Sequence, residues 1–201
     1  MANVAGPAGR LPRAQRREQI LAAATRAFAR AGFAATSLDD IAAEAGITRV
    51  ILYRHFESKT DLYQAVLNRV CALLMAHIGE SVGSFTDASV DGLLAAAAAE
   101  PAGFRLLFVH AAREPEFQAC IDGFRSELTR IAHARIKTAV PDGAWAQWAA
   151  RLATAVAVEA VIAWLDVGQP DATTAADRIR RAIAGVIAAA DSPARPSARR
   201  T

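Results

Sequence analysis

The sequence predicts an all-α protein of about nine helices, with a three-helix helix-turn-helix unit at the N-terminal end and a larger helical domain after it. Apolar residues recur at helical spacing along most of the chain, and Gly and Pro mark the breaks between these stretches. Patterns typical of helix caps stand at Ser37 and Ser58. Hydrophobic residues make up 53% of the 201 residues and charged residues 21%, which is typical of a globular helical protein rather than a disordered one.

The chain is expected to divide into four segments. Residues 1–12 are predicted to be a flexible arm, and residues 13–57 form the helix-turn-helix domain. Residues 58–190 form the larger helical domain, and residues 191–201 are a Pro-, Arg- and Ser-containing tail that we expect to be disordered.

The first helix is expected from about residue 14 to residue 31, and Gly32 ends it. Its inward face consists of apolar residues at helical spacing, namely Ile20, Ala23, Ala24, Ala27 and Phe28.

Two short helices joined by a tight turn are expected next. Ser37 and Asp40 stand three residues apart, which is the spacing of a capping box, so the first short helix begins at Ser37. Gly46 ends it, because glycine adopts the left-handed conformation without a steric penalty. Ile47 and Leu52 are expected to pack inward from the second short helix, as a helix-turn-helix requires.

A second capping box at Ser58 predicts a long helix that reaches about residue 80. Further helices are expected at about 89–99, from Pro101 to Pro115, and from about 116 to 138.

The last two helices are expected at about 144–167 and 171–190. The first of them is apolar nearly all round and must be covered on several sides. A partner subunit is one cover, because two copies of this helix pair can form a four-helix bundle, and burial within one subunit is the alternative. We therefore predict a homodimer whose interface includes Trp148, Leu152, Val156, Ile162, Ile179, Ile183 and Val186.

The second short helix carries polar residues on its free side, and its N-terminal part suits the major groove of double-stranded DNA. Arg49 can bind guanine O6 and N7 in a bidentate way. Thr48 and Thr36 can bind a phosphate or a base edge, whereas Tyr53 and His55 suit phosphates, which position the protein without specifying sequence.

The charge distribution favours the same interpretation. Residues 1–60 hold nine Lys and Arg against five Asp and Glu, a net charge of +4, whereas residues 61–190 hold eleven against fourteen, a net charge of −3. A basic excess on one domain is what phosphate binding requires, although an uneven distribution by chance is the alternative. Lys59 stands in the first turn of the long helix, where free amides and a cation favour a phosphate.

The stretch from Arg16 to Val66, about a quarter of the chain, resembles the TetR family of bacterial transcriptional regulators. It contains AFARAGF, then TSLDDIA, AGI, LYRHF and SK-DL. The resemblance implies an all-helical homodimer with an N-terminal DNA-binding domain and a C-terminal domain that dimerises and binds a small molecule. One departure is Val50, where the family often has a small residue; Val50 can contact a thymine methyl or hold the backbone away. The resemblance implies DNA contacts at Thr36, Ser37, Thr48, Arg49, Tyr53, His55 and Lys59.

Candidate ligand-binding residues are less sharply marked. An apolar cavity with a few polar groups is the usual form of a small-molecule site, and Arg105 or His110 can meet an acidic ligand group. Phenylalanines at helical spacing are more often plain core, so the resemblance is the main reason to expect an effector. The candidates are Phe104, Arg105, Phe108, His110 and Phe124.

We therefore predict a sequence-specific DNA-binding transcriptional regulator, a dimeric repressor that a small hydrophobic ligand releases from its operator. No HExxH, GxGxxG, P-loop or CxxC pattern occurs, so neither an enzyme, a cofactor nor a metal is expected. The rival hypothesis is an interaction module whose helix-turn-helix no longer binds DNA.

The expected location is the cytoplasm. Cys71 and Cys120 lie in apolar helical stretches, and no secretory segment precedes the first helix. The longest apolar run, residues 152–165, is shorter than the ~20 residues that a membrane helix needs, so no membrane partner is expected.

Overall fold

The structure is a computed structural model that describes residues 11–80 and 88–191, and all regular structure in these two ranges is helical. This confirms the predicted all-α class. The predicted N-terminal arm and C-terminal tail lie almost wholly outside the described residues. The α-helices are α1 (Arg13–Ala35), α2 (Leu38–Glu44), α3 (Arg49–Tyr53), α4 (Lys59–Glu80), α5 (Ala88–Ala99), α6 (Pro101–Arg105), α7 (Gln118–Ile136), α8 (Gly143–Asp166) and α9 (Ala172–Asp191).

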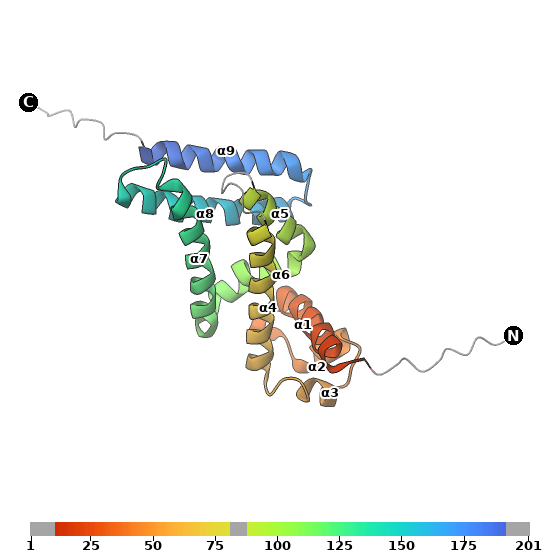
Figure 1. Ribbon diagram of the computed structural model, residues 1–201. Helices are drawn as coiled ribbons and strands as arrows, with labels where there is room; N and C mark the ends of the chain where they lie inside the picture. The colour runs from red at the N-terminus through yellow and green to blue at the C-terminus, as the bar shows by residue number, and fades with distance from the viewer. Residues whose placement is uncertain (1–10, 81–87, 192–201) are drawn as a thin grey trace, which may run out of the picture.

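The helices form two groups at opposite ends of the molecule (Figure 1). Helices α1, α2 and α3, which we call the head, lie at one end, and α8 and α9 lie side by side at the other. Helix α4 runs from the head into the rest of the protein, where it packs against α5. A change in the tilt of α4 would therefore move the head relative to α8 and α9.

The helix caps and the glycine breaks predicted for the head are present in the structure. The Ser37 amide donates to Asp40 Oδ2 at 2.9 Å, and the Asp40 amide donates to Ser37 Oγ at 3.1 Å, so the capping box that begins α2 is present. Gly46 ends α2 with a φ of 62°. Gly32, with a φ of 76°, interrupts α1 where its end was predicted, and one further turn follows to Ala35.

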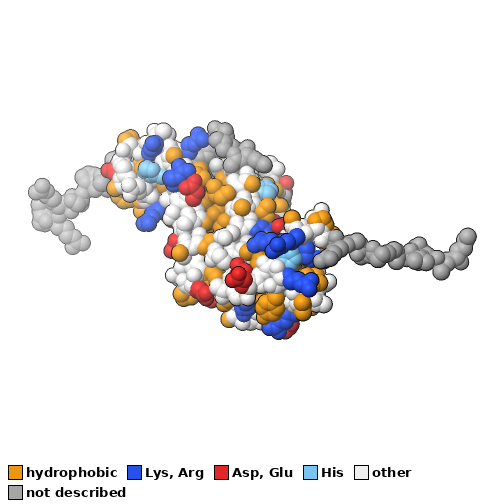
Figure 2. Space-filling model, turned by 60° about the horizontal axis from the view of Figure 1, so that its bottom comes forward, with side chains coloured by type: hydrophobic (Ala, Val, Ile, Leu, Met, Phe, Trp, Pro, Cys, Tyr) orange, Lys and Arg blue, Asp and Glu red, His pale blue; other side chains and the backbone are white. Residues whose placement is uncertain are grey.

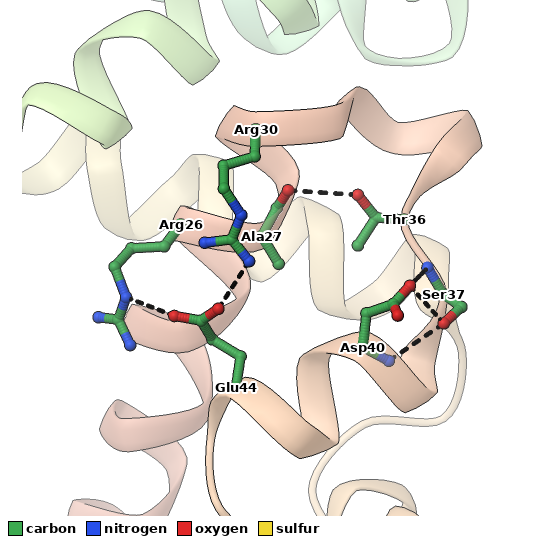
Figure 3. A network of polar contacts seen from close by, with 7 residues as sticks. All are labelled: Arg26, Ala27, Arg30, Thr36, Ser37, Asp40 and Glu44. Carbon is green, nitrogen blue, oxygen red and sulfur yellow. Dashed lines mark hydrogen bonds and ion pairs between the residues drawn. The ribbon is translucent and has the colours of Figure 1, made fainter.

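Ion pairs and hydrogen bonds join α1 to α2 (Figure 3). Arg26 and Arg30 of α1 both donate to the carboxylate of Glu44, at 2.9 and 2.6 Å, and these bonds lower the Glu44 pKa. Gln19 Nε2 also donates to the Ala45 carbonyl at 2.8 Å. Beneath these contacts, large apolar side chains fill the core of the head, namely Ile20, Phe28, Ile41, Leu52 and Phe56, each no more than 1% exposed.

An aromatic cluster joins the head to the rest of the protein. The ring of Tyr63, on α4, lies 4.7 Å from the Phe28 ring and 4.9 Å from the Phe33 ring, both on α1. On its other side it lies 4.5 Å from the ring of Phe117, which precedes α7. Phe117 also contacts Phe33 directly, with 5.2 Å between ring centroids. The head is thus packed against the segment before α7 as well as against α4.

One predicted helix proved to be irregular. The segment expected to be helical from Pro101 to Pro115 consists of α6, a π-helical turn at Leu106–His110 and a 3-10 turn at Ala111–Arg113. Glu114 is extended, with φ −100° and ψ 106°, because proline disfavours the helical conformation in the residue before it. A second 3-10 turn at Pro115–Phe117 then leads into α7.

Helix α8 is more apolar over its length than the sequence analysis allowed. Among the described residues it is the one helix long and apolar enough to cross a membrane, and the bent pair of α5 with Pro101–Arg113 passes only if it is counted as one span. The sequence analysis considered only the run at 152–165, whereas the whole helix extends from Gly143 to Asp166. Core helices of soluble proteins pass the same criterion, and α8 packs here against α7 and α9.

Candidate functional site

Helix α3 presents its side chains outward from the head. Thr48 caps the helix, since its Oγ1 accepts from the Ile51 amide at 3.4 Å. Leu52 is fully buried and anchors the helix, whereas Val50 is 63% exposed and Tyr53 is 47% exposed. An apolar side chain as open as Val50 has no packing role in the described part of the protein, so it is free to meet another molecule.

Arg49 is held in place by two neighbours. Its Nη1 donates to Asp39 on α2 at 2.9 Å, and its Nη2 donates to the Tyr53 hydroxyl at 3.1 Å. The hydrogen bond with Tyr53, followed by the charge of Asp39, raises the pKa of Arg49 further above its ordinary value. All three side chains are exposed, and exposed ion pairs contribute little, so the guanidinium can exchange these partners for a ligand at low cost.

The hydroxyl groups of two residues predicted to contact DNA form hydrogen bonds within the head instead. Thr36 is only 3% exposed, and its hydroxyl donates to the Gly32 carbonyl at 2.7 Å, so its side chain ties the end of α1 to the core of the head. The prediction of a DNA contact by this hydroxyl is therefore corrected. Ser37 is exposed, but its hydroxyl donates to Asp40 Oδ2 at 2.6 Å as well as accepting from the Asp40 amide. The bonds from Ser37 lower the pKa of Asp40.

His55 lies beside a basic pocket of about 440 Å³. The pocket lies between the start of α1 and the end of α3, where Figure 2 shows a cluster of Lys and Arg side chains with a histidine near the start of the described chain. Its walls are formed by Leu11, Arg13, Arg16, Ile51, Arg54 and His55. Within the described residues, Arg13 and Arg54 form no ion pair, so the positive charge of the pocket is not neutralised.

The His55 ring is neutral at pH 7. Burial, followed by the charges of the α1 arginines, lowers its pKa from an ordinary value already below 7. Its Nδ1 is buried, and no group in the described residues forms a hydrogen bond with it. The sequence analysis selected His55 but missed Arg16 and Arg54; the spacing of Arg13 and Arg16 on one face of α1 was the available signal for Arg16.

Lys59 closes the junction between the head and α4. Its Nζ donates to the Ala34 carbonyl at 3.2 Å and lies 4.5 Å from the centre of the Phe33 ring. Its charge is therefore positioned at the edge of the head.

The predicted ligand residues form core instead of a cavity. Phe104, Phe108 and Phe124 are at most 7% exposed, and their rings pack in series with centroids 4.7 and 5.9 Å apart. Arg105 forms an ion pair with Asp166 on α8, and His110 is half-buried beside Gly32. None of these five residues lines a pocket described here, because the aromatic rings fill the space between the helices.

Two adjacent hollows lie elsewhere in the helical domain. One is an open groove of about 960 Å³ between α7 and α8. The other is an apolar crevice of about 40 Å³ at its side, and Thr154 and Val158 line both. The remaining walls of the crevice are Ile78, Ser89, Val90, Leu93, Leu128, Ile131, Ala157 and Ile183. In the described ranges no group of three or more His, Cys, Asp or Glu is placed to hold a metal ion.

The predicted dimer residues fall into two sets. Trp148 and Leu152 are 41% and 37% exposed on α8, and Trp145, itself 51% exposed, packs edge-on against Trp148. Val156, Ile162 and Val186 are half-buried. In contrast, Ile179 and Ile183 are only 4% and 2% exposed within one subunit. Burial of this degree shows that the two side chains hold α9 against its own subunit and leave little surface for a partner.

Helices α2 and α3 are joined at Gly46, and α3 exposes cationic, aromatic and apolar side chains together. This arrangement defines a helix-turn-helix protein of the DNA-binding class. Residues 20–66 match the family described as bacterial regulatory proteins, tetR family. The match covers most of the head and the first part of α4.

Parts of the chain are also similar to known regulators. Over 105 residues the chain is 37% identical to the HTH-type transcriptional activator FasR of Mycolicibacterium smegmatis, covering 49% of this chain and 48% of FasR. Over 52 residues it is 52% identical to the HTH-type transcriptional regulator TtgR of Pseudomonas putida, covering 26% of this chain and 25% of TtgR. The chain thus spans about half the length of FasR and a quarter of TtgR.

The fold extends beyond the head. A crystal structure of a TetR-like transcriptional regulator from Rhodococcus sp. RHA1 matches 89% of this chain and 99% of its own, with a TM-score of 0.80 and 22% sequence identity. At 22% identity the match shows that the two proteins share a fold, and it covers the helical domain as well as the head.

Proposed function

We propose that the protein is a sequence-specific transcriptional regulator that binds an operator as a dimer, represses a gene and is released by a small-molecule effector. The observation that carries the DNA-binding part is the outward face of α3, where Arg49, Val50 and Tyr53 are exposed while Leu52 anchors the helix. The match of residues 20–66 to the tetR family supports the regulatory part.

Each exposed group on this face has a role in the proposal. Arg49 leaves Asp39 to bind a guanine, and Val50 contacts a thymine methyl group. Thr48, Tyr53 and Lys59 bind phosphates.

The basic pocket contributes to the proposed phosphate contacts. Arg13, Arg16 and Arg54 form a positive surface around His55 and next to α3, where the backbone of a bound duplex would pass.

The proposed dimer uses the exposed stripe of α8. Trp145, Trp148 and Leu152 leave an apolar surface that a second copy can cover by two-fold symmetry. The same pair of helices has a second apolar feature, a groove of about 610 Å³ between the later part of α8 and the first part of α9. The two α3 helices of such a dimer would read half-sites one DNA turn apart or a multiple of it.

In this proposal the protein leaves its operator when the head shifts from one tilt to another. An effector that prefers the tilt with the wrong α3 spacing lowers operator affinity, by no more than its differential affinity for the two states. The packing of Phe33 and Tyr63 on Phe117 supplies a path from the helical domain to the head.

The test is binding of the purified full chain to the DNA upstream of its own gene, compared with a random duplex of equal length across a salt series. A preference for the upstream DNA that persists as salt rises supports sequence-specific binding. Weak and equal affinity for both duplexes contradicts it, and no binding at any salt favours the interaction module.

A reporter gene under the upstream promoter tests the sign of regulation. Lower expression with the protein than without it supports repression. Higher expression would instead agree with the activity in the name of FasR.

A further inference from the structure

We propose that the α7–α8 groove and its crevice form the effector site, and that the effector is a small organic anion with a short apolar tail. This inference rests on the proposed regulatory function and replaces the aromatic cluster as the ligand site. It also replaces a purely hydrophobic ligand with one that carries a negative head group.

The crevice determines the size and polarity of the ligand tail. Its walls come from α4, α5, α7, α8 and α9, and its side chains are apolar except for two hydroxyl residues. One of these, Thr154, already donates to the Ala150 carbonyl at 2.8 Å, so it offers no free donor. A volume of about 40 Å³ holds a few carbon atoms, which favours a short alkyl group.

The charged side chains of the groove determine the charge of the ligand head group. Three basic side chains of the groove, Arg130, His133 and Arg151, lie near the connection between α7 and α8. The carboxylates of the groove, Asp122 on α7 and Glu159 on α8, lie farther from this connection. Polar donors accompany the cations, namely Ser126, Thr129 and Gln147.

The arginines differ in their availability. Arg130 donates to both carboxylate oxygens of Glu127, at 2.8 and 2.6 Å, so its charge is already neutralised. Arg125 and Arg151 form no ion pair with any group in the described ranges, and both are exposed. An unpaired guanidinium binds a carboxylate or phosphate through paired hydrogen bonds, which selects an anion over a neutral molecule.

The position of this site suits regulation. Arg151 precedes Leu152 of the exposed apolar stripe, and the crevice contacts both Ile78 near the end of α4 and Ile183 of α9. A tail longer than the few carbon atoms that the crevice of about 40 Å³ holds must separate these helices. Binding therefore shifts α4 relative to the proposed dimer helices.

The test uses three probes with one tail, hexanoate, 1-hexanol and hexylamine, and the full chain without DNA. Calorimetric titration of the wild type should give the tightest binding for hexanoate. Arg151→Ala should weaken hexanoate binding about tenfold, the loss expected for a hydrogen bond to a charged group, and leave hexanol unchanged. Arg135→Ala, an exposed arginine of α7 outside the groove, is the matched control and should bind hexanoate like the wild type.

Ala157→Leu tests the crevice separately, since a larger side chain there fills the space that the tail needs. It should weaken all three probes while circular dichroism remains that of the wild type. Equal affinity for hexanoate and hexanol, or hexanoate binding unaffected by Arg151→Ala, would overturn the proposal. Because these titrations contain no DNA, a failure to bind an operator leaves their result unchanged, and the two proposals fail independently.

Discussion

Arg49 Nη1 lies 2.9 Å from Asp39 Oδ2, so the side chain best suited to read a base is paired with an acidic residue of the preceding helix. A bidentate contact with guanine would use two of the five N–H donors of Arg49, so Arg49 would have to give up or rearrange its bond with Asp39. The Asp39 carboxylate would then lie close to the negatively charged DNA. We expect this repulsion to oppose binding where no guanine contact compensates for it, which is how opposing interactions produce specificity.

Replacing each partner of this pair should have opposite effects on DNA binding. Arg49→Ala should remove the preference for the operator over random duplex and cost about 1–3 kcal/mol in operator affinity. Asp39→Ala should tighten binding to random duplex, because a negative charge is removed from the DNA-facing surface. Fluorescence anisotropy on both duplexes measures this. Equal losses on the two duplexes for Arg49→Ala would sink the base-reading assignment.

Arg54→Ala should weaken binding to operator and random duplex alike. A lost phosphate contact lowers the steepness of log affinity against log salt by about 1, because one fewer counterion is released. The salt series gives this slope directly, and Arg135→Ala on α7 is the control. An unchanged slope would show that the basic pocket beside His55 does not touch DNA.

Leu152→Asp and Ile183→Ala should separate the dimer surface from the subunit core. Leu152→Asp places a charge on the exposed stripe, so sedimentation should detect monomers with unaltered helix content. Ile183→Ala opens space in the core and should lower the free energy of unfolding by about 2–4 kcal/mol while the folded protein stays dimeric. The reverse pattern would return Ile183 to the interface.

The capping box predicts a pH dependence. The pKa of Asp40 is lower in the folded protein, chiefly through its hydrogen bonds with Ser37, so ionised Asp40 stabilises the folded state above its unfolded pKa of about 4. This contribution is lost as the pH falls through the lower, folded pKa. The difference in melting temperature between wild type and Asp40→Asn should therefore be largest near pH 7 and shrink below pH ~4. A constant difference from pH 7 to pH 2 would contradict the role of the carboxylate.

Tyr63→Phe should leave the stability unchanged or increase it slightly. The Tyr63 hydroxyl is buried and has no hydrogen-bond partner among the described residues, and burial raises its pKa well above the ordinary range. Removing an unpaired buried polar group relieves its desolvation cost, while the ring contacts to Phe28, Phe33 and Phe117 remain. Thermal unfolding of the two proteins makes the comparison. A clear loss of stability would mean that the hydroxyl has a partner, such as a bound water.

The sequence alone determined the parts of this protein that depend on neighbours a few residues away. The capping box of Ser37 and Asp40 and the left-handed turn at Gly46 were predictable, because their hydrogen bonds and dihedral angles involve only adjacent turns. The outward face of α3 followed from them once Leu52 was assigned to the core.

Only the tertiary structure decided where residues distant in the sequence meet. Thr36 looked available for DNA, and only the packing of the head, which leaves the side chain 3% exposed, placed it in the core. Phe104 and its neighbours matched a ligand site and a core equally well by spacing, and their mutual packing decided for the core. Ile179 and Ile183 share the apolar pattern of a dimer surface, because helical periodicity identifies a face without identifying what covers it.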